Sequence, residues 1–266
     1  SRREGMTMTT IINVANQKGG VGKTTTAVTL GHGLARAGRR VLLVDLDPQG
    51  HVAFALGMKK TNGLYRLLVE SEPLHKVAEV ARPNLDIIAS DKTGEAVGRY
   101  VTTLNFRELV IKKALKGSTY DVIILDTPPS LGVLHVAALV ASHWILIPTK
   151  LDAMAVDGVN EILRSMAEVE QDEDNGHKFE GYSILPTFFD RTTKETTTQL
   201  RELVNAFGKI VWPPIPQDTK AREAAAFGKT LWEYCPDSPS IMGYQFNGKR
   251  AGGYLDLLDR IQEVIQ

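Results

Sequence analysis

A glycine-rich segment near the start of the chain constrains the fold more than any other feature. It lies between an apolar run at 11–15, typical of a short buried strand, and a stretch at 24–37 with apolar residues at helical spacing. The segment consists of Lys18, Gly19, Gly20, Val21, Gly22, Lys23, Thr24 and Thr25. A strand, a tight loop and a helix in this order predict a binding site at the loop, because ligands of open α/β sheets bind at the carboxyl ends of strands.

Further apolar runs recur along the chain with helical stretches between them. Strands are predicted at 41–45, 85–89, 121–126 and 144–148, with weaker ones at 182–185 and 210–212. Helices are predicted at 106–115, 158–169 and 255–265. This alternation indicates an α/β fold with a mostly parallel sheet and helices on both faces. No linker rich in Gly, Ser or Pro divides the chain, so we expect a single domain over 9–266 after a tag or disordered start at 1–8.

Composition excludes several classes of protein. The 31 Lys and Arg balance 31 Asp and Glu, so the chain as a whole lacks the basic footprint of many nucleic-acid binders, although local basic patches stay possible. Cys235 is the only cysteine, which rules out an internal disulfide or a cysteine cluster within one chain. No apolar run reaches 18 residues, so no stable membrane insertion is expected and the predicted location is the cytoplasm.

The loop has the chemistry of a phosphate site. A helix start offers free backbone N–H groups and a positive dipole end to an anion, and glycines let the backbone curl around phosphate oxygens. Lys23 can reach the β- and γ-phosphates, and the Thr24 hydroxyl can hold Mg²⁺, as in the P-loop NTPase fold. The strict P-loop pattern requires glycine where Gln17 stands, and an extra lysine, Lys18, follows it. The alternative is a glycine-rich turn with surface lysines.

Carboxylates follow two of the predicted strands, where a metal–nucleotide site would need them. Asp45 and Asp47 end the second strand and would lie on the same side if the strand continued that far. Asp126 follows the apolar run at 122–125 and fits a position that holds Mg²⁺ through water. The alternative reading of Asp126 is a helix N-cap or turn residue, and the two readings are compatible.

The segment from Lys18 to Thr25 resembles the deviant Walker A box of the ParA/MinD superfamily. The resemblance implies ATP and Mg²⁺ as cofactors and a face-to-face homodimer in which Lys18 reaches the neighbouring subunit's ATP. Residues 45–49, Asp-Leu-Asp-Pro-Gln, are similar to a family element whose second Asp positions the attacking water. That role falls on Asp47, so the implied catalytic residues are Lys18, Lys23 and Asp47. Gln49 is expected near the water or the metal.

The resemblance continues through the second half of the chain. Residues 186–192 look like an altered form of a family segment, and residues 215–218, Ile-Pro-Gln-Asp, stand where the family lines the adenine. Pro216 and Asp218 are therefore expected to contact the base. Gln217 departs from the family, because partition relatives have an Arg of the DNA-binding set there. Candidate contacts to DNA are Arg191, Lys194, Arg201, Lys220, Arg222, Lys229 and Arg250, each of which is alternatively a solvated surface charge.

Two further features favour the short, Soj-like ParA group. The terminal stretch 255–266 is amphipathic but net acidic, which favours packing against the domain over binding to anionic lipid. No long segment precedes the loop. The implied function is a DNA partition ATPase that forms an ATP-sandwich dimer, binds nonspecific double-stranded DNA at the nucleoid and hydrolyses ATP when stimulated by a ParB-like partner. The alternatives are an ATPase that positions a protein cargo or acts at a membrane surface, and a non-enzymatic scaffold that binds nucleotide. No role is assigned to His51 or Cys235.

Overall fold

The computed structural model describes residues 8–130, 132–173, 176–246 and 248–265, so most of the predicted disordered start, residues 1–7, lies outside it. Within these ranges, seven strands form one sheet in the order β3-β4-β2-β5-β1-β6-β7. They are β1 Thr10–Val14, β2 Val41–Asp45, β3 Glu79–Arg82, β4 Leu85–Ile88, β5 Val122–Asp126, β6 Trp144–Lys150 and β7 Gly181–Thr187. Neighbouring strands are parallel except β3, which is antiparallel to β4. The predicted mostly parallel α/β fold is confirmed.

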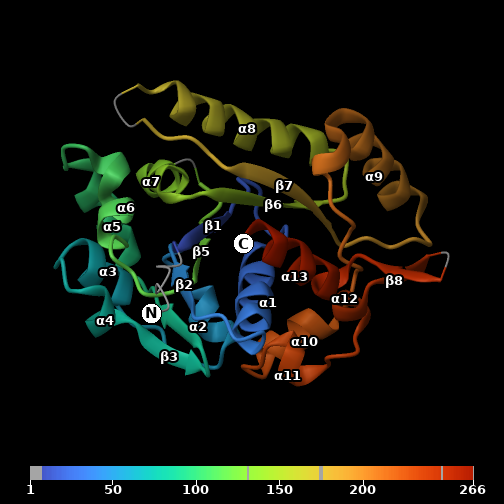
Figure 1. Cartoon of the computed structure of the whole chain (residues 1–266), viewed down its shortest axis with the longest axis horizontal. Helices are drawn as coiled ribbons and strands as arrows, with labels where there is room; N and C mark the ends of the chain where they lie inside the picture. The colour runs from blue at the N-terminus through green and yellow to red at the C-terminus, as the bar shows by residue number, and fades with distance from the viewer. Residues whose placement is uncertain (1–7, 131, 174–175, 247, 266) are drawn as a thin grey trace, which may run out of the picture.

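Helices cover both faces of this sheet (Figure 1). The first half of the chain contributes α1 Lys23–Arg36, α2 His51–Ala55, α3 Gly63–Leu68, α4 Leu74–Val77, α5 Gly94–Thr102, η1 Arg107–Leu109, α6 Val110–Ala114 and α7 Val133–Ala141. The second half contributes α8 Ala155–Gln171, α9 Lys194–Phe207, η2 Gly208–Ile210, α10 Lys220–Ala226, α11 Leu231–Tyr234, α12 Pro239–Met242 and α13 Gly253–Val264. A short hairpin, β8 Tyr244–Phe246 and β9 Lys249–Ala251, stands apart from the sheet.

Alternate residues of the central strands serve two separate cores, which explains why these strands are almost entirely apolar. In β5, Val122 and Ile124 pack with α1, α2 and α13, whereas Ile123 and Leu125 pack with α3, α5, α6 and α7 on the opposite face. A third core joins β6 and β7 to α8 and α9. As predicted, the C-terminal helix α13 packs inward, with Tyr254, Leu257 and Ile261 buried. No described helix has the length and apolar character needed to cross a lipid bilayer.

The prediction of a strand at 210–212 is wrong. Gly208–Ile210 forms the 3₁₀ helix η2, and Val211 makes only an isolated bridge to Ile184. Pro213 and Pro214 follow directly and have no N–H group to donate, so a ladder cannot continue there. The helix predicted at 106–115 is split into η1 and α6.

The sheet order brings three chain segments to one edge. β1 lies between β5 and β6, and β2 lies on the far side of β5. In the strand register, Asp126 pairs with Val14 on one side and with Asp45 on the other. The glycine-rich loop, the segment after Asp45 and the segment after Asp126 therefore all leave the sheet side by side at its carboxyl edge.

Candidate nucleotide-binding site

The glycine-rich loop connects β1 to α1 and is anchored at its middle. Gly20 and Gly22 have φ angles of +71° and +90°, a left-handed conformation that residues with a side chain rarely adopt. Val21 is buried between them, and its carbonyl accepts a hydrogen bond from the Thr187 hydroxyl at the end of β7 (2.9 Å). The loop is thus held open in a shape that leaves the N-terminus of α1 accessible.

The two lysines of the loop have different partners. The Lys23 ammonium donates to the carbonyl oxygen of Lys18 (3.0 Å), whereas the Lys18 ammonium forms an ion pair with Asp152 just after β6 (2.6 Å). Burial lowers the pKa of Lys23, and the negative charges of Asp126 and Asp47 act in the opposite direction. Lys23 therefore lies at the phosphate end of the loop, and Lys18 is held to its own chain.

The two aspartates at the end of β2 have different roles: Asp45 binds the backbone, and Asp47 lines the pocket. Asp45 is buried and accepts hydrogen bonds from the backbone N–H groups of Asp47 (3.0 Å) and Val52 (3.1 Å). β2 ends at Asp45, so Asp47 lies in the following turn and lines the pocket. The expectation that the two side chains lie on one side of the strand is therefore wrong, and Asp45 binds backbone instead.

Asp126 fits a metal-binding position. It is buried, its Oδ2 accepts a hydrogen bond from the Thr24 hydroxyl (2.7 Å), and its Oδ1 has no hydrogen-bond partner among the described residues. Burial raises the pKa of Asp126 from 3.8 to about 7; the Thr24 hydroxyl and Lys23 oppose the shift, and Asp47 adds to it. Burial, reinforced by Asp126, also raises the pKa of Asp45 well above its usual range. A divalent cation next to Asp126 would occupy its unpaired oxygen and stabilise its charge.

The metal would need ligands beyond the protein. No group of three or more His, Cys, Asp or Glu side chains in the described part of the chain could hold a metal ion. Mg²⁺ commonly binds through one or two protein oxygens together with phosphates and water. Thr24 and Asp126 supply oxygens of this kind, so the residues present fit Mg²⁺ bound together with a nucleotide.

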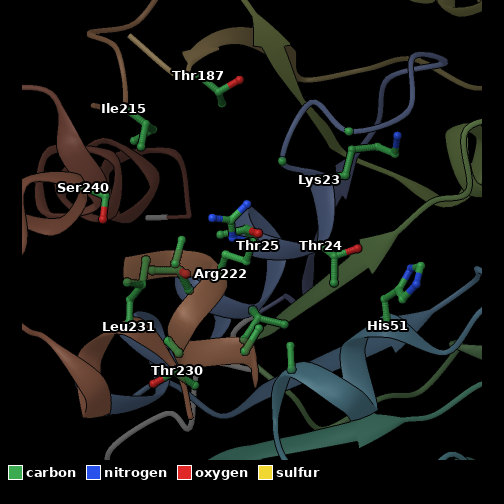
Figure 2. A pocket seen from close by; sticks show the side chains of 18 of the residues that line it. Lys23, Thr24, Thr25, His51, Thr187, Ile215, Arg222, Thr230, Leu231 and Ser240 are labelled. Carbon is green, nitrogen blue, oxygen red and sulfur yellow. The ribbon is translucent and has the colours of Figure 1, made fainter. Parts of the chain in front are cut away.

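A pocket of about 670 Å³ extends from the loop toward the C-terminal helices (Figure 2). Its phosphate end includes predicted residues Gly19, Gly20, Gly22, Lys23, Thr24, Thr25 and Asp47. Its other end is more apolar and includes Val28, Ile215, Pro216, Ala224, Leu231 and Tyr254, together with Asp218. A triphosphate at one end and a flat base at the other match this division. Lys18, Val21 and Asp126 are not among the lining residues.

Asp218 is less available than expected for contact with a base. Its Oδ1 accepts the backbone N–H of Lys220 (2.9 Å), and its Oδ2 accepts the hydroxyl of Ser240 (2.9 Å). The carboxylate therefore joins the start of α10 to α12. Pro216, by contrast, lies directly in the wall of the pocket.

The seven basic candidates for DNA contact do not form one group. Arg222 and Lys229 line the pocket. Lys220 pairs with Glu223 (2.8 Å) and Arg250 with Asp259 (3.7 Å). Arg191 lies over the ring of Tyr244, whereas Lys194 and Arg201 lie on α9. Only part of this set is thus placed away from the pocket.

Three residues at the site were not predicted from the sequence. Asn16 binds the backbone on both sides: its Oδ1 accepts from the Lys18 N–H (2.9 Å), and its Nδ2 donates to the Pro148 carbonyl (2.8 Å). Asp152 follows the carboxyl end of β6, as Asp126 stands at the carboxyl end of β5, so its position after a strand could have indicated a place at the site. His51, at the start of α2, lines the pocket, and only its closeness to Gln49 signalled this.

Comparison with known proteins shows the family of the chain. Residues 9–178 match the family model of an AAA domain. The chain is 38% identical to the chromosome-partitioning ATPase Soj of Thermus thermophilus, over 88% of this chain and 92% of that protein. It is 37% identical to the sporulation initiation inhibitor protein Soj of Bacillus subtilis, over 86% of this chain and 92% of that protein. The chain belongs to the Soj/ParA family of ATPases. The resemblance to the ParA/MinD superfamily, and to its Soj-like ParA group, is thereby confirmed for this Soj/ParA member.

Solved structures agree with the fold of this Soj/ParA member. Cobyrinic acid a,c-diamide synthase from Mycobacterium smegmatis, with a bound ATP analogue and magnesium, is 28% identical with a TM-score of 0.72 and covers 92% of this chain and 99% of its own. Apo McdA from Cyanothece is 23% identical with a TM-score of 0.77, over 86% of this chain and 94% of its own, and bears on the fold alone.

Proposed function

We propose that residues 9–266 form one ATPase domain that binds ATP with Mg²⁺, dimerises around the nucleotide, binds nonspecific double-stranded DNA and acts in partition at the nucleoid. The observation that carries the proposal is the placement of Lys23, Thr24 and Asp47 in one pocket with Lys18 on the same loop. Two lysines on one phosphate loop provide one cation for the chain's own ATP and one for a neighbouring subunit.

The chemistry of hydrolysis is positioning plus electrostatic stabilisation. In this proposal, Lys23 contacts the β- and γ-phosphates, and Asp47 orients the attacking water. Thr24 and Asp126 would hold Mg²⁺, which would neutralise phosphate charge. Lys18 leaves Asp152 and stabilises charge on the partner subunit's ATP, as an arginine finger does in other nucleotide hydrolases. A ParB-like partner would stimulate the hydrolysis.

DNA contact is proposed for the basic residues that lie away from the pocket: Arg191, Lys194, Arg201, Lys220 and Arg250. Sequence-independent binding depends on several phosphate contacts, and a dimer doubles the number that one chain offers. The two ion pairs of Lys220 and Arg250 are partly exposed, so DNA phosphates can compete for these cations.

A gel-shift assay with duplex DNA tests the proposal. We expect binding at low salt only in the presence of ATP, and progressive loss of binding as salt rises, because released counterions drive the association. The chain without nucleotide is the control. Absence of any ATP-dependent shift at low salt would favour the alternative of an ATPase that positions a protein cargo.

A further inference from the structure

Arg222 faces the nucleotide pocket from the side opposite the glycine-rich loop. It belongs to the first turns of α10, and it lines the pocket together with Gly22 and Thr25. Figure 2 shows its guanidinium pointing into the pocket rather than away from it, and Thr25 lines the same pocket. A cation therefore projects toward the start of α1, which is itself the positive end of a 14-residue helix.

The carboxylates nearest to Arg222 in sequence are engaged elsewhere. Glu223 accepts from the Lys220 ammonium (2.8 Å), the Tyr234 hydroxyl (3.0 Å) and the Thr219 hydroxyl (3.1 Å). Asp218 is held by Ser240 and by the backbone of Lys220. Within the described ranges, no side-chain hydrogen bond or ion pair of Arg222 is found. A guanidinium opposite a helix N-terminus, with no side-chain partner among the described residues, is suited to bind an anion.

The position of Arg222 along the pocket indicates which anion. Thr24 bonds to Asp126, so it marks the metal side of the pocket, where the β- and γ-phosphates would lie. Ile215 and Leu231 mark the apolar side, where the base would lie. Arg222 and Thr25 lie between these two sides. The α-phosphate, which lies between the ribose and the β-phosphate, would occupy this middle position.

We propose that Arg222 binds the α-phosphate of the nucleotide, across the pocket from α1. This inference rests on the proposed function and gives Arg222 a role other than the DNA contact expected from the sequence. A guanidinium can donate two parallel hydrogen bonds to phosphate oxygens, and such charge-assisted bonds are the strong ones. Because Lys220 lies on the same helix, the contact also fixes α10 to the nucleotide while leaving Lys220 available for DNA.

Nucleotide affinity measured by calorimetry tests the inference, with ADP and adenosine as probes and Arg222→Leu as the variant. Leucine keeps apolar cover over the pocket but removes the charge. We expect ADP affinity to fall roughly 10- to 100-fold, the range for loss of a hydrogen-bonded charge contact, while adenosine affinity stays within about twofold. Arg222→Lys should recover part of the ADP affinity. Arg99→Leu, which removes an exposed arginine from α5, is the matched control and should leave both affinities unchanged.

Two outcomes overturn the inference. One is unchanged ADP affinity in Arg222→Leu. The other is an equal loss for ADP and adenosine, which would assign Arg222 to the base. Failure of the unaltered chain to bind ADP or ATP would overturn the proposed function as well, so the two failures are distinguishable. Arg222 is exposed, and thermal melting of Arg222→Leu should match that of the unaltered chain.

Discussion

The Lys18 ammonium lies 2.6 Å from Oδ2 and 2.7 Å from Oδ1 of Asp152 in the same chain. A lysine held in this way cannot at the same time contact the phosphates of a second subunit. If Lys18 acts across a dimer, the ion pair must break before or during dimerisation. The pair is partly exposed, with 37% and 24% of the two side chains accessible, so its strength is modest.

We therefore predict that Asp152→Asn favours the ATP-bound dimer. An exposed ion pair contributes up to about 1 kcal/mol, and a symmetric dimer breaks one such pair in each subunit, so the substitution should tighten dimerisation by up to about 30-fold. The dimer dissociation constant, measured by analytical ultracentrifugation with a non-hydrolysable ATP analogue, checks this. Asp157→Asn removes a carboxylate from the nearby first turn of α8 and should have no effect. Weaker dimerisation in Asp152→Asn would contradict the prediction.

Turnover should depend on both lysines of the loop. Lys18→Ala and Lys23→Ala each remove a cation that the proposed reaction needs at the phosphates, so each should abolish measurable ATP turnover. A cation that stabilises charge in phosphoryl transfer contributes on the order of 10³-fold or more. Phosphate release measures the effect, and Lys116→Ala, at an exposed position after α6, is the control. Near-normal turnover in Lys18→Ala would refute its proposed role.

Asp47→Ala should separate ATP binding from hydrolysis. The side chain lines the pocket and its Oδ1 accepts the Gln49 N–H (2.8 Å), but it is not part of the loop that holds phosphates. We expect the variant to bind ATP and to accumulate as a dimer, because the attacking water is no longer oriented. Size-exclusion chromatography with ATP gives the readout. A strictly monomeric variant would exclude the sandwich-dimer arrangement.

Without nucleotide, Asp126 should make the protein less stable as the pH rises. Its pKa is raised from 3.8 to about 7 by burial, so the folded state binds more protons than the unfolded state between these values. Stability from this group is therefore lost as the pH rises from about 4 through 7. Relative to the unaltered chain, the unfolding free energy of Asp126→Asn should gain on the order of a few kcal/mol more at pH 8 than at pH 4, since one pKa unit is about 1.4 kcal/mol. Urea denaturation in EDTA tests this, and an equal difference at both pH values would contradict it.

Gly57 is predicted to be intolerant of any side chain. Its φ is +69°, and a Cβ there would lie 2.8 Å from the carbonyl oxygen of Gly228, in the turn that follows α10. Gly38 has a similar φ of +89° but open space around it, which makes Gly38→Ala the matched control. We expect a loss of unfolding free energy of about 1–2 kcal/mol for Gly38→Ala and about 1–3 kcal/mol more for Gly57→Ala. Equal losses in urea melts would show that the close approach is unimportant.

The sequence predicted the central part of the fold well because those strands are buried on both faces. Residues 41–44 and 122–125 are all apolar, and no other pattern in these segments competes with the strand prediction. The helix α9 went unpredicted: it contains three consecutive threonines, Thr196 to Thr198, which have low intrinsic helix propensity, and its helical state depends on packing of Leu203 beneath it. The false strand at 210–212 shows the reverse case, in which β-prone residues lack a ladder because prolines follow.

The site was predictable where chemistry is local in sequence. The loop, Asp47 and Asp126 could be located because phosphate and metal chemistry require those residue types at strand ends. The ties of Asp218 to Ser240 and of Lys18 to Asp152 join residues 22 and 134 positions apart. Nothing in a single sequence indicates such pairings, since they depend on how α12 and the end of β6 are placed.

The loop is also attached to the end of β6 at two points, through Asn16 to Pro148 and through Lys18 to Asp152. In genetic terms, a mutation in the loop and a mutation in the segment 148–154 are expected to influence each other's effect, because the two segments are attached. Mutations that compensate for a defective loop are therefore expected to accumulate in this segment. A screen for such suppressors should return substitutions there, far from the loop in sequence but next to it in space.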